Sequence, residues 1–326
     1  MLRGVDLAEV GQHLRNVRVL PFIAAVVIAT AAFPIRTVRW WYLLRIDGEA
    51  LPILPLWHAT AIGFMANNVL PARGGEVARA YAARRLTGVP FTTAAATLVV
   101  ERILDGLTLV MLLAIAAAAG GFSTDTKIGD VPLASIMTGA SILFAMVLGV
   151  AMIAVWFPDF SLGATRTIAK AVFPDRWADK ITAIVKNLLD GLEVLRSARR
   201  FITVTAWSFA VWGVNGLSFL ACFFAFDLQA PVSAAFVLQS IIAFGVAVPS
   251  SPGFFGPFEL ATRVTLAAYG IGATAAVSYA VGYHIGTFLP ITLLGLWSLS
   301  RAHLHLTDLR GGPTAALTDT EPATQP

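Results

Sequence analysis

The chain has 326 residues, of which 57% are hydrophobic and 13% are charged, and its mean hydropathy is +0.76. A soluble domain carries about 25% charged residues, so this apolar excess is more than a soluble core would bury and is expected to face lipid. The net charge of +4 does not indicate nucleic-acid binding, because basic residues in a membrane protein first report orientation, and the single cysteine, Cys222, excludes a disulfide framework.

Long apolar stretches recur along the chain, and a membrane-spanning helix needs about 20 mostly apolar residues. Five stretches meet this requirement, at residues 19–38, 91–119, 132–157, 201–226 and 273–299. Residues 301–326, rich in Thr, Ala, Pro and Gly, are expected to form a disordered cytoplasmic tail. The sequence therefore predicts an all-α polytopic membrane helix bundle, with residues 1–300 forming a single membrane domain.

The distribution of Lys and Arg predicts the orientation of these spans. Residues 158–201 contain eight basic residues, whereas residues 120–131 contain only Lys127 and residues 227–230 contain none. Cytoplasmic loops are enriched in Lys and Arg, so residues 158–201 are expected to be cytoplasmic and the other two loops external. The C-terminus is then also expected to be cytoplasmic.

Two shorter apolar stretches, about 51–70 and 231–249, end at segments rich in Pro and Gly. The neighbouring spans place both ends of each region on one side of the membrane, so a single crossing does not fit. We therefore expect re-entrant hairpins at about 51–88 and 231–270 that enter from opposite faces as an inverted-topology pair. The alternative is two ordinary loops in which the shared order of Pro, Gly, Glu and Arg arises by chance. The expected backbone breaks are Pro71, Gly74, Gly75, Pro252, Gly253 and Gly256.

Residues 176–196 have a different pattern, in which apolar residues recur at helical spacing and charged residues occupy the other face. This pattern predicts an amphipathic helix at the cytoplasmic interface. Two interpretations remain open for it: a connector between spans, and a contact with anionic lipid through its basic residues.

Three ionisable residues, Glu101, Arg102 and Asp105, lie within the expected span 91–119. Glu101 and Asp105 are four residues apart and share one helix face. An ionised group at membrane depth costs at least about 3 kcal/mol, so these residues require partners or water. The hairpins supply partners, and we expect a polar cavity near the bilayer midplane with four bases and four acids. This charge-balanced set is Arg73, Arg79, Arg102, Arg263, Glu76, Glu101, Asp105 and Glu259.

Helices are expected to restart after Gly75 and after Pro257, with their N-termini facing this cavity. A helix N-terminus attracts anions such as phosphate through its partial positive charge and free N–H groups. Arg73 and Glu259 lie beside the breaks and are expected to contact a ligand. The alternative is that the ion pairs only lock the hairpins to neighbouring helices.

Four motifs occur in order: RTVRWWYLLR (36–45), NNVLPARGGEVAR (67–79), ERILDG (101–106) and PSSPGFFGPFE (249–259). Together they resemble the flippase-like membrane family that includes the transmembrane region of lysylphosphatidylglycerol synthases. The resemblance covers about residues 10–300 and implies a multi-pass plasma-membrane protein. In some members it implies movement of a phospholipid between leaflets. Its polar positions fall here on Arg39, Asn68, Arg73, Glu76, Arg79, Glu101, Arg102, Asp105 and Glu259.

The resemblance also implies one more span upstream of residue 19 and, in the synthases, a soluble aminoacyl-transferring domain. This sequence begins where a loop would follow that extra span, so either the span is absent or the true start lies upstream. No segment after Arg301 resembles the soluble domain, so synthase activity is not expected. We expect the substrate-binding residues to be Asn68, Arg73, Glu76, Arg79, Glu101, Arg102, Asp105 and Glu259, and we nominate no catalytic residue.

The leading functional hypothesis is a lipid translocase that moves a phosphate-bearing lipid or lipid-linked intermediate across the plasma membrane. The expected partners are membrane lipids, either an anionic phospholipid or a lipid-linked phosphate, with a second copy or a cell-envelope enzyme as further partners. The alternatives are a membrane-embedded transferase acting on a polyprenyl-phosphate or phospholipid substrate, and an envelope scaffold that does not transport.

Cofactors are not expected. The chain has no Walker-type GxxxxGK[ST] motif, so ATP is not expected to drive movement. His303 and His305 lack third and fourth ligands, so a zinc site is not expected. The sequence does not identify the driving force, and a desolvated Glu101 or Asp105 is a candidate for proton coupling only.

Overall fold

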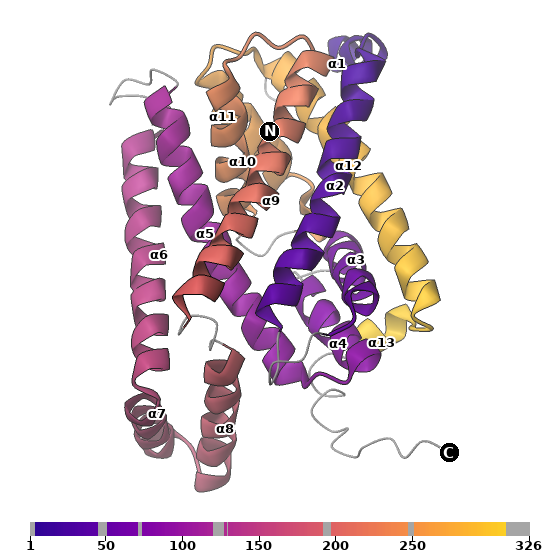
Figure 1. The fold of residues 1–326 in the computed structure, drawn as a ribbon. Helices are drawn as coiled ribbons and strands as arrows, with labels where there is room; N and C mark the ends of the chain where they lie inside the picture. The colour runs from indigo at the N-terminus through magenta and orange to yellow at the C-terminus, as the bar shows by residue number, and fades with distance from the viewer. Residues whose placement is uncertain are drawn as a thin grey trace.

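The computed structural model describes residues 4–44, 51–70, 74–119, 127–128, 130–191, 197–246 and 251–310. This part of the chain is helical apart from a short antiparallel ribbon of β1 (Lys127–Ile128) and β2 (Val131–Pro132). The all-α membrane bundle predicted from the sequence is confirmed (Figure 1). The helices are α1 (Leu7–Arg15), α2 (Val19–Leu43), α3 (Ile53–Val69), α4 (Gly75–Thr87), α5 (Phe91–Ala119), α6 (Leu133–Trp156), α7 (Pro158–Val172), α8 (Asp175–Gly191), α9 (Ala198–Ala225), α10 (Val232–Gly245), the 3-10 turn η3 (Pro252–Phe254), α11 (Pro257–Ala267), α12 (Ala273–Arg301) and α13 (Leu306–Arg310).

Four of the described helices are long and apolar enough to cross a membrane, namely α2, α6, α9 and α12. They coincide with four of the five spans expected from the sequence. The fifth expected span is helix α5, which has 29 residues and is therefore about 43 Å long. Glu101, Arg102 and Asp105 lie within α5, and its crossing of the membrane stays a prediction.

Both expected hairpins are pairs of short helices joined across a break. The first pair is α3 and α4, and the second is α10 and α11, with η3 in the break between them. Gly253 and Gly256 have φ angles of 65° and 98°, which side chains other than glycine rarely adopt. Pro71 and Arg73 lie outside the described residues. The turn η3 packs against α3, so the two hairpins meet at their broken ends.

The same order of helices, one long, two short and one long, occurs twice, in α2–α5 and in α9–α12. In Figure 1 the two sets run in opposite directions: α2 descends and α9 ascends, while α5 ascends and α12 descends. Equivalent helices of the two sets make equivalent contacts. Helix α3 packs on α12 of the other set, and α10 correspondingly packs on α5. Within each set, α4 packs on α5 and α11 on α12, and the first helices α2 and α9 pack on each other. The two sets therefore have inverted topology, as expected, with α6–α8 inserted between them.

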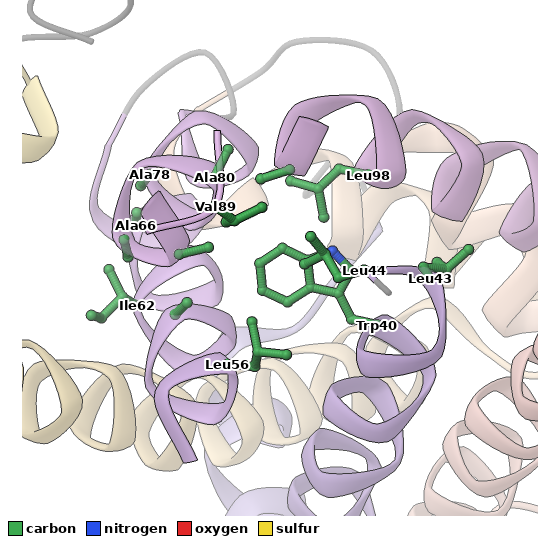
Figure 2. Packing of buried hydrophobic residues seen from close by; sticks show 14 of the residues in the cluster. Trp40, Leu43, Leu44, Leu56, Ile62, Ala66, Ala78, Ala80, Val89 and Leu98 are labelled. Atoms are coloured by element: carbon green, nitrogen blue, oxygen red, sulfur yellow. The ribbon is translucent and has the colours of Figure 1, made fainter. Parts of the chain in front are cut away.

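Trp40 at the end of α2 fixes how the first hairpin packs (Figure 2). Its side chain is fully buried, and its Nε1 donates to Thr97 Oγ1 of α5 at 2.9 Å. Small residues of α4 allow the tryptophan to come close, and Figure 2 shows Ala80 of α4 on its side of the helix with Leu56 of α3 and Leu98 of α5 around the ring. One aromatic residue thus joins α2 to both hairpin helices and to α5.

Helices α3 and α4 approach each other closely through Gly63 and Gly75. A Cβ on Gly75 would overlap the Gly63 carbonyl oxygen and the Asn67 side chain, whose Oδ1 already accepts from Gly75 N at 2.9 Å. We expect Gly75→Ala to lower stability by about 1–3 kcal/mol, because a backbone group must move. Thermal unfolding in detergent measures this, with Gly149→Ala in an open helical position as control. Equal melting temperatures for both variants would contradict the prediction.

The amphipathic helix expected at residues 176–196 is α8, which with α7 extends below α6 in Figure 1. Residues 192–196 lie outside the described residues. The expected tail of residues 301–326 differs in its first part, because residues 306–310 form α13. Leu304 and Leu309 are buried in the same apolar cluster as Trp40, and this packing orders the segment.

Candidate functional site

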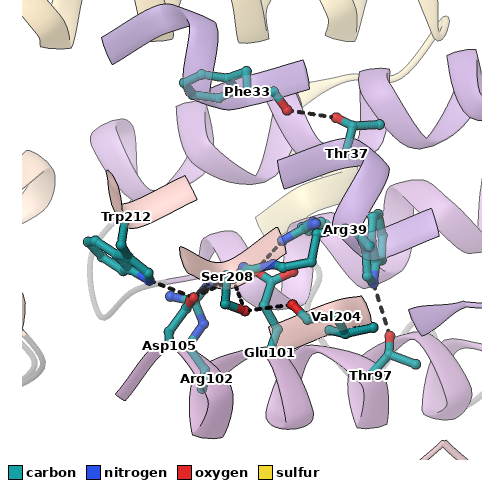
Figure 3. A network of polar contacts seen from close by, with 12 residues as sticks. Phe33, Thr37, Arg39, Thr97, Glu101, Arg102, Asp105, Val204, Ser208 and Trp212 are labelled. Carbon is teal, nitrogen blue, oxygen red and sulfur yellow. Dashed lines mark hydrogen bonds and ion pairs between the residues drawn. The ribbon is translucent and has the colours of Figure 1, made fainter. Parts of the chain in front are cut away.

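Glu101 on α5 is the centre of a buried charge network and is fully buried itself. Its Oε1 lies 2.7 Å from Arg102 Nη2, 2.8 Å from Arg79 Nη1 and 3.1 Å from Arg39 Nη2. These arginines come from α5, α4 and α2, so one carboxylate oxygen connects three helices. Figure 3 shows Arg39 and Arg102 on either side of it. Three guanidinium groups therefore compensate the charge of Glu101.

Asp105 lies one helical turn further along the same face of α5, as its spacing from Glu101 predicts. It is paired with Arg39, and its Oδ2 lies 3.4 Å from Arg102 Nη2. Trp212 Nε1 of α9 donates to Asp105 Oδ1 at 2.7 Å. Arg39 also donates to Ser208 Oγ at 3.0 Å, so the network includes both crossing helices α2 and α9 (Figure 3).

A cavity of about 510 Å³ lies against this network, between the two hairpins. This volume is within the range of pockets that hold small ligands. One part of its wall is aromatic and another is charged, which suits an amphiphilic ligand. The aromatic part includes Phe33, Phe64, Trp212, Phe219, Phe258 and Phe288. The charged and titratable part includes Arg36, Glu76, Arg79, Arg102, Asp105 and His284.

Arg36 on α2 is 5% exposed and lines this cavity. Its guanidinium carbon lies 5.1 Å from the ring centroid of Phe64 and 5.2 Å from that of Trp212. No carboxylate of the described residues forms an ion pair with it. The described part of the cavity and network contains four arginines, namely Arg36, Arg39, Arg79 and Arg102, and three carboxylates, namely Glu76, Glu101 and Asp105. One positive charge is therefore in excess.

Glu259 on α11 and His284 on α12 form a second polar group, and both are buried. His284 Nδ1 lies 2.5 Å from Glu259 Oε1, and Nε2 lies 2.8 Å from the Gly253 carbonyl oxygen. The rings of Phe255 and Phe258 lie on the imidazole, with centroid distances of 4.4 Å each. Glu259 therefore pairs with a histidine and stays apart from the arginine network.

The structure brings most of the expected substrate-binding residues together. Glu76, Arg79, Arg102 and Asp105 line the cavity, and Glu101 lies behind them. Asn68 also lines it and donates to Thr292 Oγ1 at 2.8 Å. Arg73 lies outside the described residues, and Arg263 does not belong to the lining.

Two helix N-termini expected to bind phosphate are occupied by side chains of the protein. At the start of α4, Asn67 accepts from Gly75 N, and before α11, Glu259 Oε2 accepts from Gly256 N at 2.6 Å. The positive charge of the cavity therefore comes from its arginines. The expected balance of four bases and four acids also differs, because Arg36 and Arg39 join the network while Glu259 pairs elsewhere.

Arg36 and His284 are the residues that sequence analysis did not place in the site. Arg36 lies three residues before Arg39 in an apolar helix, and this spacing is the signal that would have placed both on one face. His284 has no signal in its own helix, because its partner lies on a different helix. Among the described residues, no group of three His, Cys, Asp or Glu side chains is placed to hold a metal ion.

Comparison with known proteins gives a family model and several relatives. The model described as the lysylphosphatidylglycerol synthase TM region matches residues 1–295. The chain is 27% identical over 310 residues to glycosyltransferase AglD of Haloferax volcanii, covering 86% of this chain and 48% of AglD. It is 23% identical to a UPF0104 membrane protein of Methanothermobacter thermautotrophicus, covering 80% of this chain and 77% of the relative.

A UPF0104 membrane protein of Methanocaldococcus jannaschii is also 23% identical, over 70% of this chain and 90% of the relative. The chain spans about half the length of AglD, so the relative has a further part that this sequence does not match. No solved structure matches the chain.

Proposed function

This chain belongs to the lysylphosphatidylglycerol synthase transmembrane-region family, and from that premise we propose that it is a lipid translocase of the plasma membrane. Its substrate is a lipid with an anionic, phosphate-bearing head group. The head group passes through the cavity between the two hairpins, while the acyl chains remain in the bilayer.

The observation that carries this proposal is Arg36. A buried guanidinium without a carboxylate partner is costly, because desolvation of a charge is repaid only by a partner. Its cation–π contacts with Phe64 and Trp212 repay part of that cost. An anion in the cavity would compensate the rest of this desolvation cost. A phosphate accepts two parallel hydrogen bonds from the planar guanidinium.

Arg79 of α4, which lines the same cavity, supports the same interpretation. It is 3% exposed, and its Nη2 has no hydrogen-bond acceptor among the described residues. A buried donor without an acceptor costs about 1–3 kcal/mol, so the charge of Arg79 is incompletely compensated within the described protein. The aromatic part of the wall suits the apolar region of a lipid next to its head group.

The test uses proteoliposomes with phosphatidylglycerol that carries a fluorophore on one acyl chain. A membrane-impermeant reductant bleaches the outer-leaflet pool, and translocation appears as loss of the protected inner pool. We expect faster loss with the protein than in protein-free vesicles, and faster movement of phosphatidylglycerol than of zwitterionic phosphatidylcholine. Equal rates with and without the protein would refute translocation.

The relative named glycosyltransferase AglD supports a second candidate, a membrane-embedded transferase acting on a polyprenyl-phosphate or phospholipid substrate. The same arginines would bind its phosphate. Incubation of the reconstituted protein with a polyprenyl phosphate and a nucleotide sugar separates the two functions. A glycosylated lipid detected by mass spectrometry supports the transferase, and movement without a new product supports the translocase.

A further inference from the structure

The pair of His284 and Glu259 is the part of the cavity that head-group binding does not use. Each imidazole nitrogen faces an oxygen atom: Nδ1 faces Glu259 Oε1 at 2.5 Å, and Nε2 faces the Gly253 carbonyl oxygen at 2.8 Å. His284 is 6% exposed and Glu259 is 4% exposed. Water therefore has little access to either group.

These contacts determine how many protons the pair holds. A carbonyl oxygen only accepts hydrogen bonds, so Nε2 carries a proton. A neutral imidazole has one N–H, which would leave a lone pair on Nδ1 facing the lone pairs of the carboxylate. A separation of 2.5 Å requires a hydrogen between those atoms. Two nitrogens that each face an oxygen therefore suit a pair with a second proton, and such a pair is neutral with this proton and carries one negative charge without it.

Other titratable groups lie on the helices that pack against α12. Helix α11 contributes Glu259, and α2 contributes Arg36 to the same cavity. Helix α3 contributes His58, which lies against Trp297 outside the cavity lining, and α1 has Glu9 and His13 paired at 3.7 Å. On α12 itself, Tyr283 hydrogen-bonds Ser218 of α9. Of the described residues, Glu259 is the one acid that contacts His284.

The pair also holds the break in the second hairpin through two further hydrogen bonds. His284 Nε2 donates to the Gly253 carbonyl, and Glu259 Oε2 accepts from Gly256 N. Between them, Phe254 has a φ of 63°, a left-handed conformation that costs about 1–2 kcal/mol for a residue with a side chain. Gly253 and Phe254 line the cavity, so these hydrogen bonds connect the pair to the cavity wall.

We propose that His284 and Glu259 form a proton-binding site that couples proton movement to passage of the anionic head group. This step rests on the proposed translocation. With the proton bound, the pair is neutral and the excess positive charge of the arginines attracts an anion. After the proton leaves to water, the negative charge of the pair cancels that excess. Proton and anion therefore bind together, and by linkage each raises the affinity for the other.

Coupling belongs to this pair and not to Glu101 or Asp105, the candidates from the sequence. Those carboxylates each contact arginine side chains, so their charge is already compensated. One proton moves with one negative charge, which makes the coupled movement electroneutral. A pH difference of one unit then corresponds to about a tenfold change in the ratio of lipid between the two leaflets.

The experiment uses the same vesicles and acyl-labelled phosphatidylglycerol, with and without a pH difference of one unit between inside and outside. The phosphodiester has a constant charge near neutral pH, so any dependence on pH belongs to the protein. We expect lipid to accumulate in the leaflet on the alkaline side. A pH-sensitive dye inside the vesicles should report proton entry with inward lipid movement.

The variants His284→Gln and Glu259→Gln should each bring the leaflet ratio with a gradient back to the ratio without one. His58→Gln, which changes a half-buried histidine outside the cavity, should keep the wild-type response. If neither variant can be reconstituted, the wild-type protein alone tests the coupling. Its two readouts are the change of the leaflet ratio with the pH gradient and the entry of protons during lipid movement. Movement of lipid that ignores the gradient overturns coupling and leaves translocation standing. An absence of movement in the wild type contradicts translocation, and coupling falls with it.

Discussion

Arg36→Ala should lower the rate of phosphatidylglycerol translocation by about 10- to 150-fold, which corresponds to the loss of one hydrogen-bonded contact with a charged group. The side chain lines the cavity and has no carboxylate partner among the described residues, so its removal leaves no acid unpaired. We therefore expect the melting temperature to stay within the range of surface variants while transport falls. The vesicle assay and thermal unfolding measure the two effects separately.

Two further variants sharpen this prediction. Arg36→Lys keeps the charge but loses the planar donors and the stacking against Phe64 and Trp212, so it should restore only part of the rate. Arg166→Ala on α7 removes an arginine whose side chain is 57% exposed, and it should transport like the wild type. A normal rate for Arg36→Ala would exclude head-group binding at this residue.

The parts of the fold that the sequence predicted depend on local patterns. Apolar length predicted the long helices, and the Pro and Gly residues near positions 71 and 252 predicted where the short ones break. The spacing of Glu101 and Asp105 placed both on one face of α5, where the structure also has them. Each of these signals lies within a single helix or a single turn, so no tertiary information is needed to interpret it.

The remaining site residues depend on how helices pack, and a sequence without tertiary contacts does not contain that information. Arg36 reads as an orientation signal at the end of an apolar span, and only the crossing of α2 with α9 brings Trp212 to it. His284 is a lone histidine in an apolar helix, and its partner lies 25 residues earlier in the chain. The turn between α11 and α12 is what brings that partner back.

Glu101→Ala should have the opposite profile to Arg36→Ala and lower stability by about 3–5 kcal/mol. Glu101 is the shared partner of Arg39, Arg79 and Arg102, and the first two are almost fully buried. Its removal leaves the buried Arg79 without its carboxylate acceptor and leaves Arg39 and Arg102 to share Asp105, which costs more than the pairs themselves contribute. Thermal unfolding in detergent measures the loss, and Glu76→Ala, which lines the cavity without an ion pair among the described residues, is the matched control.

A double-mutant cycle then separates pairing from packing. Arg79→Ala also removes the contact of its guanidinium with the Trp40 ring at 4.0 Å, so this single variant is destabilised as well. If the ion pair at 2.8 Å contributes, Arg79→Ala with Glu101→Ala should lose less stability than the two single changes added together, by about 0.5–3 kcal/mol. Strict additivity would mean that Glu101 acts on Arg39 and Arg102 alone. In that case α4 would be held to α5 by its small residues around Trp40, and the charge network would bind α2 to α5 without the hairpin.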